Sequence, residues 1–237
     1  MQYQDMREHL QDCIRQAGAL AMSYYGNPLT LILKKDGFAT QADIAVEQFL
    51  MQQLGTILPE ASFYAEESGQ SGDHHDGYCW VIDPIDGTTN FARGIPYFCI
   101  SVALTFNGEP VLGIIYQPVL DELFYAQQSG GAWLNGVRLS KPADKQGMKL
   151  VIASLWSSGR KSVKRGYTLR YFGAAALDCA YLASGKLDGL EFGGVAWWDI
   201  AAGILLLKEA GLPVTVTKRT AGGKDVYRVI AGDTGKD

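Results

Sequence analysis

Two carboxylates follow an apolar run within residues 80–91 (WVIDPIDGTTNF). Asp83 ends the run, and Asp86 comes three positions later, after Pro84. Proline fixes its own φ and keeps the preceding residue extended, so a turn after Pro84 can bring both carboxylates to one side. Oxygen ligands favour a hard cation such as Mg²⁺ over zinc. The carbonyl of Ile85 stands where the turn could direct it at the same ion.

A glycine and a helix start come directly after these acids. Gly87 lets the backbone approach a ligand closely, and residues 88–90 (TTN) are typical of a first helical turn. The free N–H groups of such a turn bind anions, phosphate in particular. A D-x-x-D-G sequence alone is usually a capped turn, but the complete run after an apolar strand predicts a site for a metal and a phosphate.

Two further segments place acids where elements begin or end. In residues 63–68 (FYAEES), Glu66 and Glu67 follow a short strand, and in residues 197–203 (WWDIAAG), Asp199 opens an apolar helix. Taken alone, the glutamates would be a solvated turn, and the aspartate would be a helix cap worth about 1 kcal/mol. Their combination with the first run gives them weight as ligands.

Together the three segments resemble the signature motifs of the inositol monophosphatase family, which are Mg²⁺-dependent, lithium-sensitive phosphomonoesterases. The resemblance runs nearly end to end, since Lys34 or Lys35 and residues 40–43, 133–136 and 173–185 match further landmarks. It implies an α/β fold of the layered αβαβα sandwich type. It also implies two or three Mg²⁺ ions per site, held by Glu66, Asp83, Asp86, Asp199, the Ile85 carbonyl and, in an outer or third-metal position, Asp43.

The resemblance also assigns roles in hydrolysis. Thr88 with Glu66 would orient the attacking water, and the Gly87 and Thr88 amides would hold phosphate. The substrate would further contact Asp86, Asp199 and an acidic residue upstream of Asp199. Glu191 is the nearest candidate for that residue, with a spacing that differs from the family pattern by about one position.

The implied function is hydrolysis of small phosphate monoesters, inositol monophosphate or related sugar phosphates, by direct attack of water. Fructose-1,6-bisphosphate, histidinol phosphate, NADP and 3′-phosphoadenosine nucleotides remain alternatives, because pocket residues set this choice. An RNA-associated binding role is an alternative of another class, and only the basic segment 160–170 supports it. It overlaps residues 155–166, which are rich in Gly, Ser and basic residues and stand where family members usually carry a helix.

The bulk properties fit one catalytic domain over residues 1–237, in two packed halves of about 1–145 and 146–237. The apolar runs are far shorter than the roughly 20 residues of a membrane span, and residues 1–8 (MQYQDMRE) do not resemble a signal peptide. The four cysteines form no C-x-x-C pair, which favours buried free thiols and a cytoplasmic location. The formal charge of −4 makes nucleic-acid binding an unlikely function. Because relatives are often homodimers, we expect a homodimer.

Hydrophobic periodicity predicts the elements that position these acids. Apolar residues spaced three and four apart predict helices over residues 4–25, 42–54, 173–184 and 198–210. Short apolar runs between turn residues predict strands over residues 29–34, 61–65, 78–82, 98–106, 111–116, 123–127, 149–154, 167–172, 214–216 and 226–231. Hairpins rather than strict βαβ alternation indicate largely antiparallel or mixed sheets.

Overall fold

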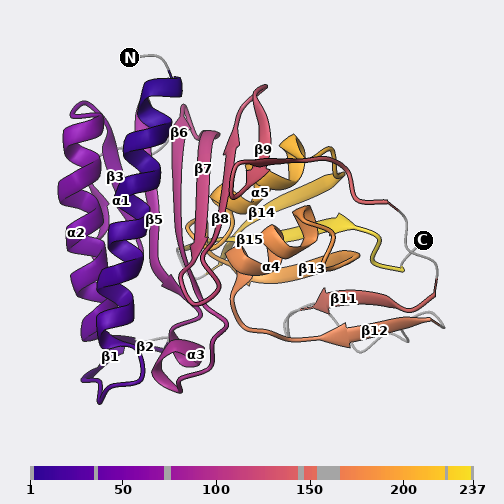
Figure 1. Ribbon diagram of the computed structural model, residues 1–237, viewed down its shortest axis with the longest axis horizontal. Helices are drawn as coiled ribbons and strands as arrows, with labels where there is room; N and C mark the ends of the chain where they lie inside the picture. The colour runs from indigo at the N-terminus through magenta and orange to yellow at the C-terminus, as the bar shows by residue number, and fades with distance from the viewer. Residues whose placement is uncertain are drawn as a thin grey trace.

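Helices and β-sheets alternate in layers (Figure 1). The computed structural model describes residues 3–34, 37–71, 76–143, 147–153, 166–221 and 224–235. The helix pair α1 (Tyr3–Tyr24) and α2 (Gln41–Ile57) covers one face of an eight-stranded sheet. The pair α4 (Ala175–Ala183) and α5 (Ala201–Glu209) lies between this sheet and a five-stranded sheet. The short helix α3 (Thr88–Ala92) follows the strand that carries the two aspartates.

The eight-stranded sheet has the order β10-β9-β8-β7-β6-β5-β3-β4. Its only parallel pair is β3 with β5, where Ala65 pairs with Ile82. Because parallel strands end at the same edge of a sheet, this register places Glu66 beside Asp83. The strands are β3 (Ser62–Ala65), β4 (Gly69–Ser71), β5 (Tyr78–Asp86), β6 (Cys99–Phe106), β7 (Glu109–Gln117), β8 (Glu122–Gln127), β9 (Gly131–Leu134) and β10 (Val137–Leu139).

The five-stranded sheet has the order β12-β11-β13-β15-β14. The strand β11, second in this order, is parallel to both neighbours, and the other pairs are antiparallel. Its strands are β11 (Lys149–Ala153), β12 (Tyr167–Arg170), β13 (Gly189–Val195), β14 (Val214–Ala221) and β15 (Lys224–Gly232). A separate hairpin joins β1 (Leu31–Lys34) to β2 (Gly37–Thr40).

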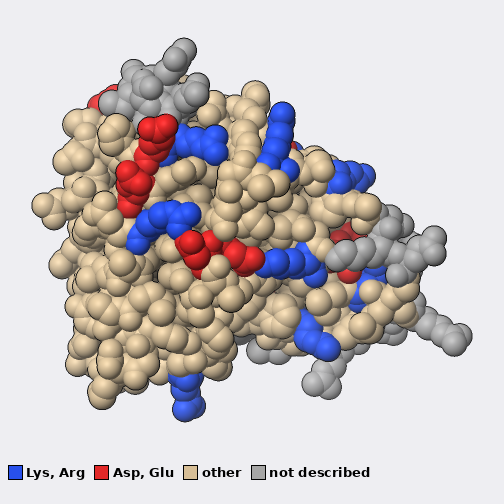
Figure 2. Space-filling view, in the orientation of Figure 1, with Lys and Arg blue, Asp and Glu red and all other residues tan. Residues whose placement is uncertain are grey.

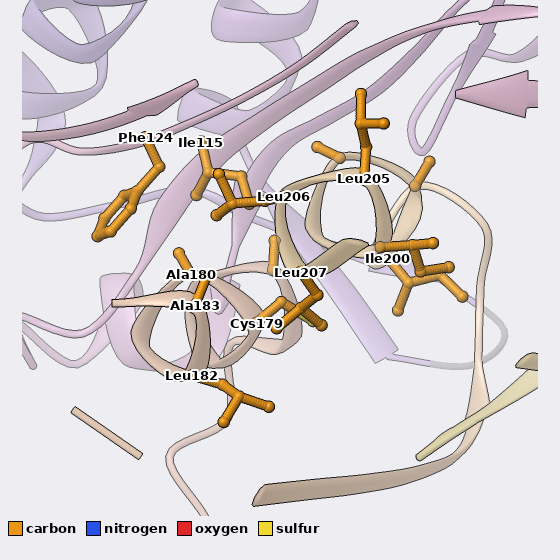
Figure 3. Close-up of a cluster of buried hydrophobic side chains, with 14 of the residues drawn as sticks. Ile115, Phe124, Cys179, Ala180, Leu182, Ala183, Ile200, Leu205, Leu206 and Leu207 are labelled. Atoms are coloured by element: carbon orange, nitrogen blue, oxygen red, sulfur yellow. The ribbon is translucent and has the colours of Figure 1, made fainter. Parts of the chain in front are cut away.

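Two apolar cores hold the layers together. One buries the apolar stripe of α1 and α2 against the eight-stranded sheet, and the other surrounds α4 and α5. Figure 3 shows Ile115 and Phe124 of the eight-stranded sheet together with Leu206 and Leu207 of α5 in the second core. Strands β6 and β7 are buried along almost their whole length. They therefore read as continuous apolar runs rather than as alternating ones.

Two glycines let α5 approach its neighbours closely. A Cβ on Gly113 of β7 would lie 3.0 Å from the Ala202 carbonyl oxygen, and a Cβ on Gly203 would lie 2.5 Å from the Cys179 Cβ. Backbone therefore packs directly on backbone where α5 crosses β7, and the backbone of α5 at Gly203 packs against the Cys179 side chain of α4. Since Asp199 stands just before α5, these contacts fix where its carboxylate can lie.

The layered α/β fold and its mixed sheets are confirmed. The described helices form two layers, and none of them covers the outer face of the five-stranded sheet. The helix predicted from Trp198 begins at Ala201, and the strands β2, β4, β9, β10 and β13 were not predicted. All four cysteines are free and buried, as expected. Among the described helices, we find none with the length and hydropathy needed to cross a bilayer.

Candidate active site

Strand β5 brings Asp83 and Asp86 together through a β-bulge. Asp83 pairs with Ser101 and Asp86 with Cys99, so three steps on β5 face two steps on β6. A bulge leaves a residue outside the ladder and bends the strand, and Pro84, which has no N–H to donate, fits such a position. The Ile85 N–H donates to Asp83 Oδ1 at 3.1 Å. The proline after Asp83 thus produces the turn expected from the sequence.

Gly87 and Thr88 continue this turn into α3. Gly87 has φ 92°, a conformation that favours glycine. A Cβ there would also meet the Tyr97 carbonyl oxygen at 3.1 Å and the Ala174 Cβ at 3.2 Å. The Thr88 hydroxyl lies 3.1 Å from both the Asp43 Oδ1 and the Ile85 carbonyl oxygen. Thr88 therefore connects the β5 turn to α2.

Asp43 has its own place at the start of α2. Its Oδ2 accepts hydrogen bonds from the Thr40 amide at 2.8 Å and the Thr40 hydroxyl at 2.5 Å, which forms a capping box. The side chain is fully buried. Burial raises its pKa, while the hydrogen bonds from Thr40 and Thr88 act in the opposite direction. The other oxygen is the one that faces Thr88 and the β5 turn.

Asp83 is at the centre of a group of mutually repelling carboxylates. Its side chain is 2% exposed, and burial raises its pKa well above the ordinary value. Four neighbouring carboxylates raise it further: Glu66, Asp86, Asp199 and Asp43. The three motif segments therefore meet in space, and their like charges disfavour ionisation in the absence of a cation.

Asp86 lies against the start of α4. Its Oδ1 accepts from the Ala175 amide at 3.0 Å, and its Oδ2 accepts from the Ala176 and Leu177 amides at 2.7 and 3.3 Å. Burial raises the pKa of Asp86 and the nearby Asp178 adds to the shift, while these amides lower it. This contact joins the turn at the end of β5 to the start of α4.

Asp199 does not cap α5, whose N-cap position is Ile200. Its Oδ2 accepts instead from the Ala196 amide at 2.7 Å. Burial raises its pKa, and the charges of Asp86 and Glu66 raise it further. The interpretation of Asp199 as a simple helix cap is therefore wrong, because its carboxylate lies among the other acids.

The ammonium group of Lys34 contacts the acidic pair that follows β3. Its Nζ donates to Glu66 Oε1 at 3.0 Å and to Glu67 Oε1 at 2.5 Å. A pocket of about 230 Å³ opens here, and Lys34, Phe38, Glu66, Gly87, Thr88 and Gly173 are among its lining residues. No three His, Cys, Asp or Glu side chains of the described residues are arranged closely enough to form a complete metal site as they stand.

Glu191 lies apart from this group. It is 2% exposed, and its Oε1 accepts from the Arg228 guanidinium at 2.8 Å. The register between β13 and β15 shifts between Gly193 and Val195, so Gly194, with φ 79°, is an extra residue in β13. The bulge therefore places one residue outside the strand register between Glu191 and Asp199.

Several residues around the site were not identified from the sequence. Asp178 and Tyr97 stand behind Asp86, with the Tyr97 hydroxyl 2.6 Å from Asp178 Oδ1. Glu47 accepts from the Glu67 and Ser68 amides, both at 2.8 Å. The basic segment lies outside the described residues up to position 165, as does Lys35.

Comparison with known proteins agrees with this geometry. The model of the inositol monophosphatase family matches residues 2–235. The chain belongs to the inositol monophosphatase family. The resemblance inferred from the three motifs is thereby confirmed, and the chain is a phosphoric monoester hydrolase that acts on a small phosphorylated substrate. Members of the inositol monophosphatase family are generally metal-dependent.

Individual relatives cover most of the chain. An inositol-1-monophosphatase from Mesorhizobium japonicum is 36% identical over 225 residues, which are 86% of this chain and 82% of that protein. Nus factor SuhB from Xylella fastidiosa is 35% identical over 214 residues, 83% of this chain and 76% of that protein. The structure of an inositol monophosphatase from Anabaena matches with a TM-score of 0.81 and 31% identity, covering 99% of this chain and 93% of that one.

Proposed function

We propose that this chain is a Mg²⁺-dependent phosphatase for inositol monophosphate or related small sugar phosphates. The observation that carries the proposal is the group of carboxylates around Asp83, which raise one another's pKa. Several buried carboxylates at one point are costly unless a cation compensates them. Their oxygen-only chemistry fits a hard divalent ion.

The proposed ligands are Glu66, Asp83, Asp86, Asp199 and the Ile85 carbonyl, with Asp43 as an outer or third-metal residue. Two or three Mg²⁺ ions, when bound there, would neutralise phosphate charge and lower the pKa of water. The Lys34 ammonium, which contacts Glu66, is a partial counter-charge beside the proposed ligands.

The chain's own groups would then bind and orient the reactants. Gly87, with its positive φ, exposes backbone at the pocket, and its amide and that of Thr88 are the proposed phosphate donors. Thr88 and Glu66 both line the pocket and are the proposed pair that orients the attacking water. Asp86 and Asp199 would contact the alcohol part of the substrate. Glu191, whose carboxylate is paired with Arg228, is the remaining proposed substrate contact.

The test is a substrate panel with the purified chain, run with and without Mg²⁺ and Li⁺. The panel contains inositol monophosphate, fructose-1,6-bisphosphate, histidinol phosphate, NADP and a 3′-phosphoadenosine nucleotide. Phosphate release from inositol monophosphate that requires Mg²⁺ and falls with Li⁺ supports the proposal. Release from none of these substrates at saturating Mg²⁺ contradicts it, and a preference for one of the others selects the alternative substrate.

The similarity to Nus factor SuhB is the observation that favours the second candidate, an RNA-associated role. On the face shown in Figure 2, the described Lys and Arg side chains lie singly or beside Asp and Glu rather than in a basic patch. We therefore keep the phosphatase as the proposed function, in the cytoplasm and as a homodimer. Salt-sensitive RNA binding with a flat substrate panel would favour the second candidate instead.

A further inference from the structure

Glu47 is a buried carboxylate that the proposed chemistry does not use. It lies on α2, four residues after Asp43, and is only 3% exposed. A buried carboxylate is costly unless hydrogen bonds compensate it. Glu47 Oε2 accepts from the Glu67 amide and Oε1 from the Ser68 amide, both at 2.8 Å. Both oxygens of its carboxylate are thus directed at the turn that follows Glu66.

This turn determines where Glu66 can place its side chain. On one side, the Glu66 amide donates to the Ile82 carbonyl oxygen at 3.1 Å, which continues the pairing of β3 with β5. On the other side, Glu47 holds the two amides that come directly after Glu66. The backbone of Glu66 is therefore fixed both by the strand that carries Asp83 and by α2.

One face of α2 reaches two parts of the site. Residues four apart on a helix lie on the same face, so Asp43 and Glu47 point in similar directions one turn apart. Asp43 contacts Thr88 at 3.1 Å, and Glu47 contacts the turn after Glu66. Helix α2 thereby sets the distance between the Thr88 hydroxyl and the Glu66 carboxylate, which the proposed function assigns to the attacking water.

We propose that Glu47 is a positioning residue, which holds Glu66 in the orientation that metal binding requires. The inference rests on the proposed function. Residues that orient metal ligands through hydrogen bonds typically change metal affinity by about 10–100-fold when they are replaced. In Glu47→Gln, one oxygen remains as an acceptor, while the new NH₂ group faces a backbone N–H and leaves that amide unpaired.

Glu209 provides a matched control. It stands at the end of α5, and its Oε1 and Oε2 accept from the Ser129 and Gly131 amides, both at 2.8 Å. Its carboxylate binds two amides of the turn between β8 and β9, as the Glu47 carboxylate binds two amides of the turn after β3. No proposed metal ligand belongs to the turn between β8 and β9. Glu209→Gln therefore repeats the loss of one hydrogen bond without touching the site.

The experiment compares the full chain with Glu47→Gln and Glu209→Gln by titration calorimetry with Mg²⁺, urea unfolding and steady-state kinetics. Glu47→Gln should raise the Kd for Mg²⁺ at least about tenfold and lower kcat more than it raises KM. Glu209→Gln should leave the Kd within about twofold while lowering stability to a similar extent. If Glu47→Gln does not fold, Glu47→Asp, whose shorter side chain cannot reach both amides, is measured instead with the same expectation.

The possible failures are distinguishable. A Kd within twofold of the unsubstituted chain in a folded Glu47 variant, with the unsubstituted chain binding Mg²⁺ and turning over substrate, overturns the positioning role alone. An unsubstituted chain that neither binds Mg²⁺ nor releases phosphate overturns the proposed function, and the positioning role with it. Equal losses of Mg²⁺ affinity in the Glu47 and Glu209 variants would reduce Glu47 to a general stabilising residue and also overturn its proposed role.

Discussion

Replacing Asp178 by Asn should make the protein more stable at alkaline pH. Asp178 is 2% exposed, and burial raises its pKa from the ordinary value of 3.8 to about 7, although the Tyr97 hydroxyl bond lowers it. A raised folded-state pKa means that the folded protein binds this proton more tightly than the unfolded chain does. The stability from this group is therefore fully present below about pH 4 and is lost as pH rises through about 7.

The size of the effect follows from the pKa difference. Roughly three pKa units correspond to about 4 kcal/mol over the whole range, of which about 2–3 kcal/mol falls between pH 5 and pH 8. Asn retains an oxygen for Tyr97, and the cost of burying its NH₂ group does not depend on pH. The change in unfolding free energy caused by Asp178→Asn should thus be about 2–3 kcal/mol more favourable at pH 8 than at pH 5.

Urea unfolding of both proteins at pH 5 and pH 8 measures this difference, which corresponds to about 1 M in the midpoint. Tyr97→Phe is the control, because it removes a hydrogen bond that lowers the Asp178 pKa. It should steepen the loss of stability with pH in the parent chain and should have no such effect in the Asp178→Asn background. Parallel pH profiles for the parent and Asp178→Asn would refute the reasoning.

Three further predictions concern the site and its supports. Asp83→Asn should abolish turnover while leaving the fold intact. Without added metal, it should also raise the unfolding free energy at pH 8, because it removes a charge that Glu66, Asp86 and Asp199 repel. Near-normal phosphate release would contradict the ligand assignment. Lys34→Met should destabilise the metal-free protein by about 1–2 kcal/mol in urea unfolding, since it removes a cation that contacts Glu66 and Glu67; an unchanged midpoint would show that these contacts contribute little. Gly113→Ala should lower the free energy of unfolding by about 1–3 kcal/mol and lower kcat by displacing α5. The control Gly55→Ala, where an added Cβ would have its nearest contact at 3.9 Å, should not destabilise the protein. Equal effects of the two substitutions would argue against the close approach of α5 to β7.

The sequence predicted the site best where one segment carries the whole feature. Residues 83–90 contain both aspartates, the bulge-forming proline, the glycine and the start of α3, so local rules sufficed for them. Neither strand alone indicates that β3 and β5 pair in parallel. The sequence did show, however, that acidic residues stand at the end of both strands. The larger helices were found because their apolar stripes are long, whereas β2, β4 and β10 have only three or four residues and too little periodicity to detect.

Contacts between residues far apart in the sequence could not be predicted from any local pattern. The carboxylate of Asp86 is held by amides that lie 89 to 91 positions later, and any residue could have provided those N–H groups. Glu47 has the spacing of an ordinary polar helix position, and only the fold shows that it is buried. The bulge at Gly194, between Glu191 and Asp199, likewise shows only in the strand register, because a bulge absorbs one residue without changing the strand's partners.

The central claim is that acidic side chains from three separate segments share divalent cations beside the pocket. A crystal structure of the protein grown with Mn²⁺ in place of Mg²⁺ tests it most directly, because anomalous scattering locates the ions independently of their coordination. We predict strong anomalous peaks within ligand distance of Glu66, Asp83 and Asp86, with Asp199 completing the group. Saturating Mn²⁺ with no peak among these residues, or with peaks only elsewhere, would contradict the account.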